Sequence, residues 1–188
     1  YWAYANWQDG MKFMEEMYKY ILKETFGTLQ FNLDGKKVDM AGEWEKWDYA
    51  TVIKDRYGID VYKSSLDDIK KALKDNKLEV EKVESRARSI DKLWKNIRKD
   101  VVGPVWLINT PKFISPLSKS NPDGYSVQRF QPIIAGSELG NGFSELNDPI
   151  DQLDRFVEQQ GMREAGDEEA MMLDIDFVEM LEYGMPPA

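Results

Sequence analysis

One short stretch of the sequence gathers side chains that could bind a charged small molecule. Between Glu138 and Leu146, two carboxylates, an amide and an aromatic ring are interspersed with glycines. If this stretch is a single strand, its side chains alternate between two faces. Leu139, Asn141, Phe143 and Glu145 then share one face, and Glu138, Gly140, Gly142 and Ser144 share the other. A plain core strand would carry Val or Ile where the first face carries polar groups.

The two glycines of this stretch are its second unusual feature. Strand interiors disfavour both Gly and Asn. Gly140 and Gly142 therefore indicate that a ligand or another backbone comes close. The alternative is a polar edge strand with a solvated face, because exposed polar alternation is common in sheets.

Several strands are predicted around this stretch. Residues 130–135 are apolar and β-branched without a helical period, which predicts a strand that ends before Gly136. The segment from Val101 to Asn109 is apolar and β-rich, apart from a Gly-Pro break, which predicts a buried central strand. Asp34-Gly35 between two short alternating runs predicts a hairpin.

Helix signals divide the rest of the chain. Periodic apolar positions, cap residues and glycine stops predict helices over residues 7–26, 49–57, 66–74, 80–99, 149–160 and 176–183. The first helix has Asn6 or Asp9 as its cap and Gly27 as its stop, and Ser65 with Asp68 resembles a capping box.

Apolar stripes predict which helix faces are buried. The stripe of the first helix is Met11, Met14, Met17, Tyr18, Ile21 and Leu22. The stripe of the helix over 80–99 includes Val80 and Val83. The two last helices are expected to bury Ile150, Leu153, Phe156 and Val157, and Phe177, Met180 and Leu181, respectively.

Composition narrows the chemistry. The 188 residues include neither Cys nor His, which excludes disulfides, thiolate metal sites and histidine-based catalysis. The net charge of −9 argues against a general nucleic-acid binder, although residues 63–100 are locally basic. The acidic stretch from Glu138 onward suits a cationic substrate or a metal ion. No apolar run approaches the ~20 residues of a membrane span, so we expect a cytoplasmic protein with no membrane contact.

The run G-S-E-L-G-N-G-F-S-E-L-N-D-P around these polar residues resembles the late active-site strand of class II lysyl-tRNA synthetases. Further similar segments follow in order, including Arg155-Phe156, the acidic run 165–170 and the run L-E-Y-G-M-P-P at 181–187. The opening Y-W-A-Y-A is similar to the end of a motif 2 strand. The resemblance is densest over residues 104–188, good over 1–27 and thin over 58–100.

The resemblance implies an α+β fold, in which an antiparallel sheet is flanked by helices and carries a helical insertion. Residues 1–62 would form the end of the motif 2 strand, a helix and a hairpin of the catalytic core. Residues 63–100 would form the insertion, and residues 101–188 the active-site strands and the last helices. The catalytic domain would be incomplete, lacking motif 1, most of motif 2 and motif 3, so we expect this piece to be inactive alone.

The roles of the family's pocket residues carry over by position. Tyr1 and Glu145 match the residues that hold the lysine ammonium in the family. The chemistry of these side chains agrees with that role, since a carboxylate and a phenol oxygen screened from water favour a primary amine over a neutral chain. Asn141 and Phe143 match neighbouring positions of the lysine pocket, one a polar contact and one a wall. Glu138 matches a carboxylate that binds the magnesium ions on ATP, and hard oxygen ligands are those that Mg²⁺ takes. No residue is assigned as catalytic.

The implied function is ATP-dependent activation of lysine and its transfer to tRNA(Lys), by a parent protein that is a homodimer. Two positions depart from the family: Gln131 stands where many members have a second metal-binding Glu, and Ser137 where many have Arg. A protein-lysylating relative that acts on a translation factor is an alternative, although such relatives have N-G-F-H-E-L where this chain has Ser144. A non-catalytic binding module is the third hypothesis.

Overall fold

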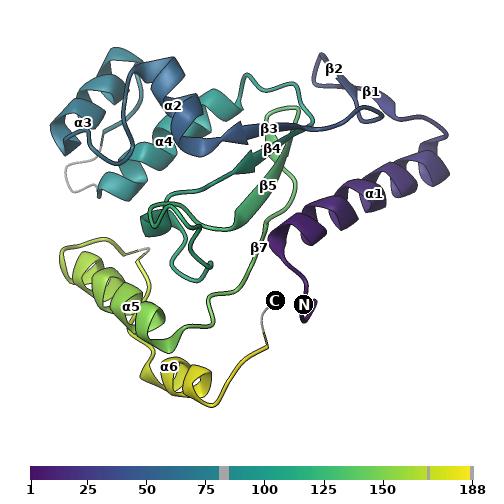
Figure 1. Ribbon diagram of the computed structural model, residues 1–188. Helices are drawn as coiled ribbons and strands as arrows, with labels where there is room; N and C mark the ends of the chain where they lie inside the picture. Colours follow the sequence, from purple (N-terminus) through teal and green to yellow (C-terminus); the bar gives the residue numbers. More distant parts are fainter. Residues whose placement is uncertain (81–84, 169, 187–188) are drawn as a thin grey trace.

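The structure is a computed structural model of the chain, and it describes residues 1–80, 85–168 and 170–186. It is an α+β fold, as predicted, in which helices surround a small mixed sheet (Figure 1). No helix within these three described ranges combines the length and apolarity needed to cross a membrane.

The main sheet has the order β3-β4-β5-β6, and β7 also pairs with β5. Its strands are β3 (Glu45–Asp48), β4 (Val105–Ile108), β5 (Arg129–Ile134), β6 (Ser137–Glu138) and β7 (Gly142–Phe143). All pairs are antiparallel except β3 with β4, which are parallel. Parallel neighbours need a crossover connection, and three helices between β3 and β4 supply it. The predicted central strand is therefore confirmed as β4, although it is shorter than expected.

The crossover helices stand together at one end of the sheet (Figure 1). They are α2 (Tyr49–Tyr57), α3 (Leu66–Asp75) and α4 (Arg86–Arg98). The capping box of Ser65 and Asp68 forms as predicted at the start of α3. The predicted start of the next helix at Val80 is wrong, because Val80 is not helical and Ser85 caps α4 instead. Val83 lies outside the described residues.

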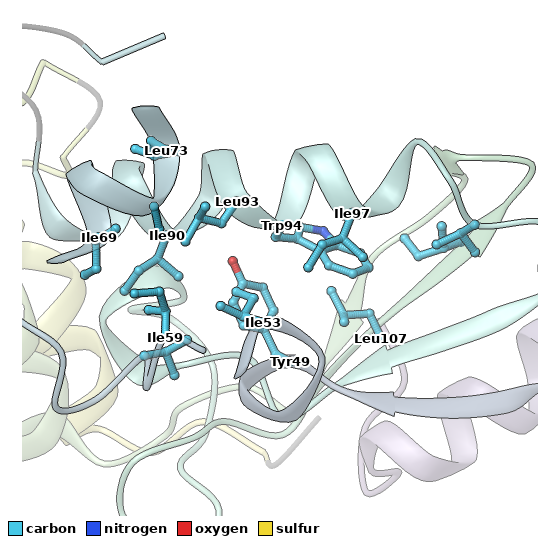
Figure 2. Packing of buried hydrophobic residues seen from close by; sticks show 14 of the residues in the cluster. Tyr49, Ile53, Ile59, Ile69, Leu73, Ile90, Leu93, Trp94, Ile97 and Leu107 are labelled. Carbon is cyan, nitrogen blue, oxygen red and sulfur yellow. The ribbon is translucent and has the colours of Figure 1, made fainter. Parts of the chain in front are cut away.

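The first hydrophobic cluster joins these helices to one face of the sheet (Figure 2). Its members include Ile90 and Leu93 of α4, Ile53 of α2 and Leu107 of β4. The rings of Tyr49 and Trp94 lie 5.9 Å apart in the same cluster. Helices α3 and α4 therefore share their core with α2 and the central strand.

The second cluster lies on the opposite face, because neighbouring residues of a strand alternate in direction. Val105 and Leu107 belong to the first cluster, whereas Trp106 belongs to the second. The ring of Trp106 lies 4.7 Å from that of Trp44 and 5.4 Å from that of Phe130.

Helix α1 (Trp7–Phe26) covers this second cluster. Asn6 caps it in a reciprocal capping box with Asp9, and Gly27 ends it in the left-handed conformation, as predicted. The predicted stripe is only partly right: Met11 is buried, but Met17 and Ile21 are exposed. The stripe is therefore wider than the face of α1 that packs on the second cluster. A separate hairpin follows, with β1 (Gln30–Leu33) and β2 (Lys36–Asp39) joined at Asp34-Gly35 as expected.

Two further helices lie beyond the sheet, α5 (Pro149–Glu164) and α6 (Ile175–Glu182) (Figure 1). The predicted stripe of α5 is only partly right: Phe156 is buried, but Ile150 and Val157 are 74% and 57% exposed. The buried face also carries three polar residues, Gln152, Arg155 and Gln159. Two of them, Gln152 and Arg155, form hydrogen bonds with the loop of residues 115–120. In α6 Leu181 is buried as predicted and Phe177 packs on Phe156, but Met180 is exposed.

Candidate functional site

The predicted strand from Glu138 to Leu146 is interrupted in the structure. Glu138 pairs with Ile133 and Gly142 pairs with Phe130, so three residues of one strand face two of β5. This is a β-bulge with one extra residue. Pro132 lies opposite the bulge and has no N–H to donate. Its carbonyl oxygen accepts a hydrogen bond from the N–H of Leu139 at 3.0 Å.

The bulge changes which residues share a face. Cross-strand partners point to the same side of a sheet. Ile133 and Arg129 are two positions of β5 on one face, so their partners Glu138 and Phe143 lie on the same side. The predicted separation of Glu138 from Phe143 is therefore wrong, because a single strand without a bulge was assumed.

The glycines of the stretch accommodate protein side chains. A Cβ on Gly142 would lie 2.4 Å from the ring of Phe130, its cross-strand partner. A Cβ on Gly140 would lie 3.2 Å from the side chain of Met14 on α1. The close approach predicted at these glycines thus exists, and the nearest protein atoms belong to the side chains of Phe130 and Met14 rather than to another backbone.

A cavity of about 660 Å³ opens between the start of α1 and β7. The backbone N–H of Trp7 donates to the buried Ser144 Oγ at 3.0 Å, which ties the start of α1 to the segment after β7. The lining residues are mostly apolar and aromatic, and Glu145 is the one that carries charge in its side chain. They are Tyr1, Trp2, Ala5, Asn6, Trp7, Gly10, Phe13, Met14, Met17, Phe130, Gly142, Phe143 and Glu145.

Glu145 is half-buried at this cavity. Burial raises the pKa of its carboxyl group. Within the described part of the chain, no hydrogen bond or ion pair reaches its carboxylate oxygens. A partly desolvated carboxylate without a partner is unfavourable alone and is favoured by a bound cation.

The other predicted site residues divide into two groups. Tyr1 and Phe143 line the same cavity as Glu145, although Tyr1 is highly exposed. Asn141 and Glu138 do not line it. The Nε of Arg129 donates to Asn141 Oδ1 at 2.6 Å.

Glu138 belongs to a separate polar group near the bulge. Arg98 of α4 contacts its Oε2 at 3.4 Å. Burial lowers the pKa of the neighbouring Arg129 guanidinium, and the negative charge of Glu138 acts in the opposite direction. Arg129 was not among the predicted site residues. Arg129 lies two residues before Gln131, immediately before the predicted strand of residues 130–135 that precedes the glycine-containing stretch. This position was the signal in the sequence that could have identified it as a candidate site residue.

The residues near Glu138 do not by themselves fit a magnesium site. Mg²⁺ prefers six oxygen ligands in an octahedron and commonly takes one or two carboxylates together with phosphates. Glu138 is engaged with Arg98, and the neutral Gln131 occupies a buried position of β5. The described residues contain no group of three or more acidic side chains placed to hold a metal ion. We therefore assign no chemical step to a metal here.

Several aromatic residues that line the cavity were also not among the predicted site residues. Trp2, Trp7 and Phe13 come from the first residues and from α1, and the rings of Trp2 and Phe13 meet edge to face at 6.1 Å. Phe13 is one position away from the predicted stripe of α1. An aromatic residue beside an apolar stripe was the signal that could have indicated a second, cavity-facing side of this helix.

Comparison with known proteins places the chain in a family. The family described as tRNA synthetases class II (D, K and N) matches residues 1–188. The chain is 43% identical over its full length to a lysine–tRNA ligase of Thermotoga maritima, and 37% identical to one of a Roseiflexus species. It is 39% identical to a lysine–tRNA ligase of Aquifex aeolicus. It spans 37%, 39% and 32% of these three relatives, respectively. With its whole length matched, the chain belongs to the class II tRNA synthetases of the D, K and N group.

Proposed function

We propose that this chain is part of the catalytic domain of a lysine–tRNA ligase and that its cavity binds the side chain of lysine. The carboxylate of Glu145, which has no hydrogen-bond or ion-pair partner among the described residues and lines an aromatic cavity, carries this proposal. A primary ammonium supplies the positive charge and the hydrogen-bond donors that the carboxylate lacks. The lysine–tRNA ligase relatives, which match the whole chain, support the same substrate.

The walls of the cavity suit the rest of the lysine side chain. Phe130 and Phe143 form apolar surface beside Glu145, against which four methylene groups would pack. Tyr1 offers a phenol oxygen and a ring face, and both are favourable neighbours of an ammonium group. A neutral side chain of equal length would leave the Glu145 charge without a partner, which is the physical basis of selectivity.

The cavity lining also separates the roles of the two substrates. It contains no Lys or Arg side chain among the described residues, so it offers no positive charge for a triphosphate. We therefore assign the amino acid side chain to this cavity and place the phosphates of ATP elsewhere.

The reaction of the whole protein would have two steps. The lysine carboxylate attacks the α-phosphate of ATP to give lysyl-adenylate and pyrophosphate, and a ribose hydroxyl of tRNA(Lys) then takes the lysyl group. Neither step needs a covalent nucleophile from this chain. Its residues would contribute by binding and orienting lysine, and tRNA charging would place the protein in the cytoplasm.

Steady-state kinetics of the full-length gene product test the proposal. In lysine-dependent ATP–pyrophosphate exchange, Glu145→Gln should raise the KM for lysine about 10- to 100-fold. This range corresponds to the roughly 1.5–3 kcal/mol of a hydrogen bond to a charged group. The KM for ATP should change far less, because the phosphates bind elsewhere.

Glu158→Gln is the matched control, because Glu158 is an exposed carboxylate on α5 outside the cavity lining. It should leave both constants close to those of the wild type. Equal losses for lysine and ATP in Glu145→Gln would mean that the ammonium is held by another group.

A further inference from the structure

Arg155 is the one charged residue that is fully buried in the described part of the chain, at 3% exposure. It lies on α5, where its Nε and Nη2 atoms donate to the two carboxylate oxygens of Asp151 at 3.0 and 2.8 Å. Lys112 also donates to Asp151, at 2.7 Å. A buried charge is costly unless it is paired, and this two-point contact fixes the plane of the guanidinium.

The remaining donors of Arg155 reach the loop of residues 115–120. Nη1 donates to the backbone carbonyl of Ser118 at 2.6 Å, and Nη2 donates to Ser120 Oγ at 2.8 Å. The carbonyls of Ser115 and Pro116 lie 3.5 and 3.4 Å from Nη1. One side chain thus holds four residues of this loop.

The same loop holds the backbone on both sides of Glu145. Ser118 forms an antiparallel bridge with Glu145. The N–H of Lys119 donates to the carbonyl of Ser144 at 2.8 Å, and the N–H of Leu146 donates to the carbonyl of Leu117 at 3.0 Å. A continuous set of contacts therefore runs from the Arg155 guanidinium through residues 117–119 to the backbone of Glu145.

We propose that Arg155 is a positioning residue for lysine recognition, which sets the place of the Glu145 carboxylate through the loop of residues 115–120. This inference rests on the proposed function of Glu145. The planar fork of arginine makes several hydrogen bonds in fixed directions, which a lysine side chain does not reproduce. A small displacement of a recognition group weakens binding strongly. Loss of the planar fork of Arg155 should therefore displace the Glu145 carboxylate and weaken the binding of lysine.

Arg155→Lys in the full-length gene product tests this proposal, because it keeps the charge and removes the fork. The KM for lysine should rise about tenfold, while the KM for ATP stays within about twofold. Arg163→Lys is the control. Arg163 is on the same helix and also donates to backbone carbonyls, those of Glu168 and Ala170, at 2.9 and 3.0 Å. It should leave the KM for lysine within about twofold of the wild type.

The double variant Glu145→Gln/Arg155→Lys separates positioning from general folding. Once the recognising carboxylate is gone, Arg155→Lys should add little to the KM for lysine, which is the non-additivity expected of coupled residues. An equal effect of Arg155→Lys in both backgrounds would overturn the positioning role. So would equal rises in the KM for lysine and for ATP.

Two outcomes distinguish this inference from the proposed function. If Glu145→Gln raises the KM for lysine and Arg155→Lys does not, the positioning role alone fails. If Glu145→Gln leaves the KM for lysine unchanged, the proposed function and the positioning role both fail.

Should Arg155→Lys not fold, Asp151→Asn replaces it, because this variant weakens the two-point contact while keeping Arg155. It should raise the KM for lysine in the same direction, and an unchanged KM would count against the proposal.

Discussion

At the scale of single residues, two carboxylates of this chain lie in opposite environments. Asp151 receives hydrogen bonds from Arg155 and Lys112, which lower its pKa to about 2. Glu145 has no such partner among the described residues, and burial raises its pKa. Carboxylates with satisfied hydrogen bonds stabilise the fold, whereas a perturbed and unpaired one in a cavity indicates a binding role.

The raised pKa of Glu145 predicts a cost to stability in the absence of ligand. Because its pKa in the folded state exceeds the unfolded value, its contribution to stability is present at low pH and is lost as the pH rises through the folded-state pKa. Glu145→Gln should therefore raise the melting temperature at neutral pH by no more than about 2–4 °C, and hardly change it at pH 4. Thermal unfolding without lysine at both pH values checks this, and a lower melting temperature at pH 7 would contradict it.

The lowered pKa of Asp151 predicts the opposite behaviour in acid. Its contribution to stability is present above the unfolded value of 3.8 and is lost as the pH falls towards about 2. Asp151→Asn should destabilise the protein at neutral pH and flatten the dependence of stability on pH between 4 and 2. Urea unfolding followed by circular dichroism at several pH values measures this slope. An unchanged slope in the variant would show that the pair contributes nothing.

At the scale of elements, local signals predicted the hairpin and the starts of α1, α3 and α5, but not the start of α4. Asn6, Ser65 and Asp148 cap helices because their side chains satisfy backbone N–H groups within a few residues. The bulge was missed because it depends on pairing with β5, although Pro132 within a strand was a warning.

The buried face of α5 shows a second limit of reading a sequence. Apolar periodicity predicts burial against an apolar core, but α5 packs on the polar backbone of residues 115–120. Gln152 and Arg155 are therefore buried while Ile150 is exposed. At the site, local sequence indicated Glu145 and Phe143, but only the fold brings the aromatic walls from α1 to them.

The contact between Gly142 and Phe130 predicts a sharp difference between two glycine substitutions. Gly142→Ala places a Cβ 2.4 Å from the ring of Phe130, so the ring must move. We expect a loss of about 1–3 kcal/mol in the free energy of unfolding, as for overpacked sites. The control Gly161→Ala lies in α5 with no atom within 4 Å of the new Cβ, and should stabilise by about 0.4–1 kcal/mol. Denaturant unfolding compares them, and equal effects would contradict this packing.

At the scale of the whole molecule, two cores on opposite faces of the sheet hold the site at the edge of the second. Helix α1 covers the second core, and its residues Tyr20 and Phe26 are exposed. The chain spans 37% of the length of its Thermotoga maritima relative. The cavity proposed to bind lysine lies near the start of α1.

We predict that the 188-residue polypeptide, which spans 37% of its Thermotoga maritima relative, does not form lysyl-adenylate alone. None of the described residues that line the cavity provides a positively charged side chain for the triphosphate, so the charge neutralisation that adenylate formation needs has to come from outside the cavity. Lysine-dependent ATP–pyrophosphate exchange should therefore be absent for this polypeptide and present for the full-length gene product. Exchange catalysed by the 188 residues alone would overturn this expectation.

The most direct test of the central claim compares lysine with norleucine, which has the same chain length and no terminal amine. Calorimetric titration of the full-length gene product should show that the wild type binds lysine at least about tenfold more tightly, and that Glu145→Gln removes most of this preference. If Glu145→Gln retains the full preference for lysine over norleucine, the ammonium group is not recognised by Glu145.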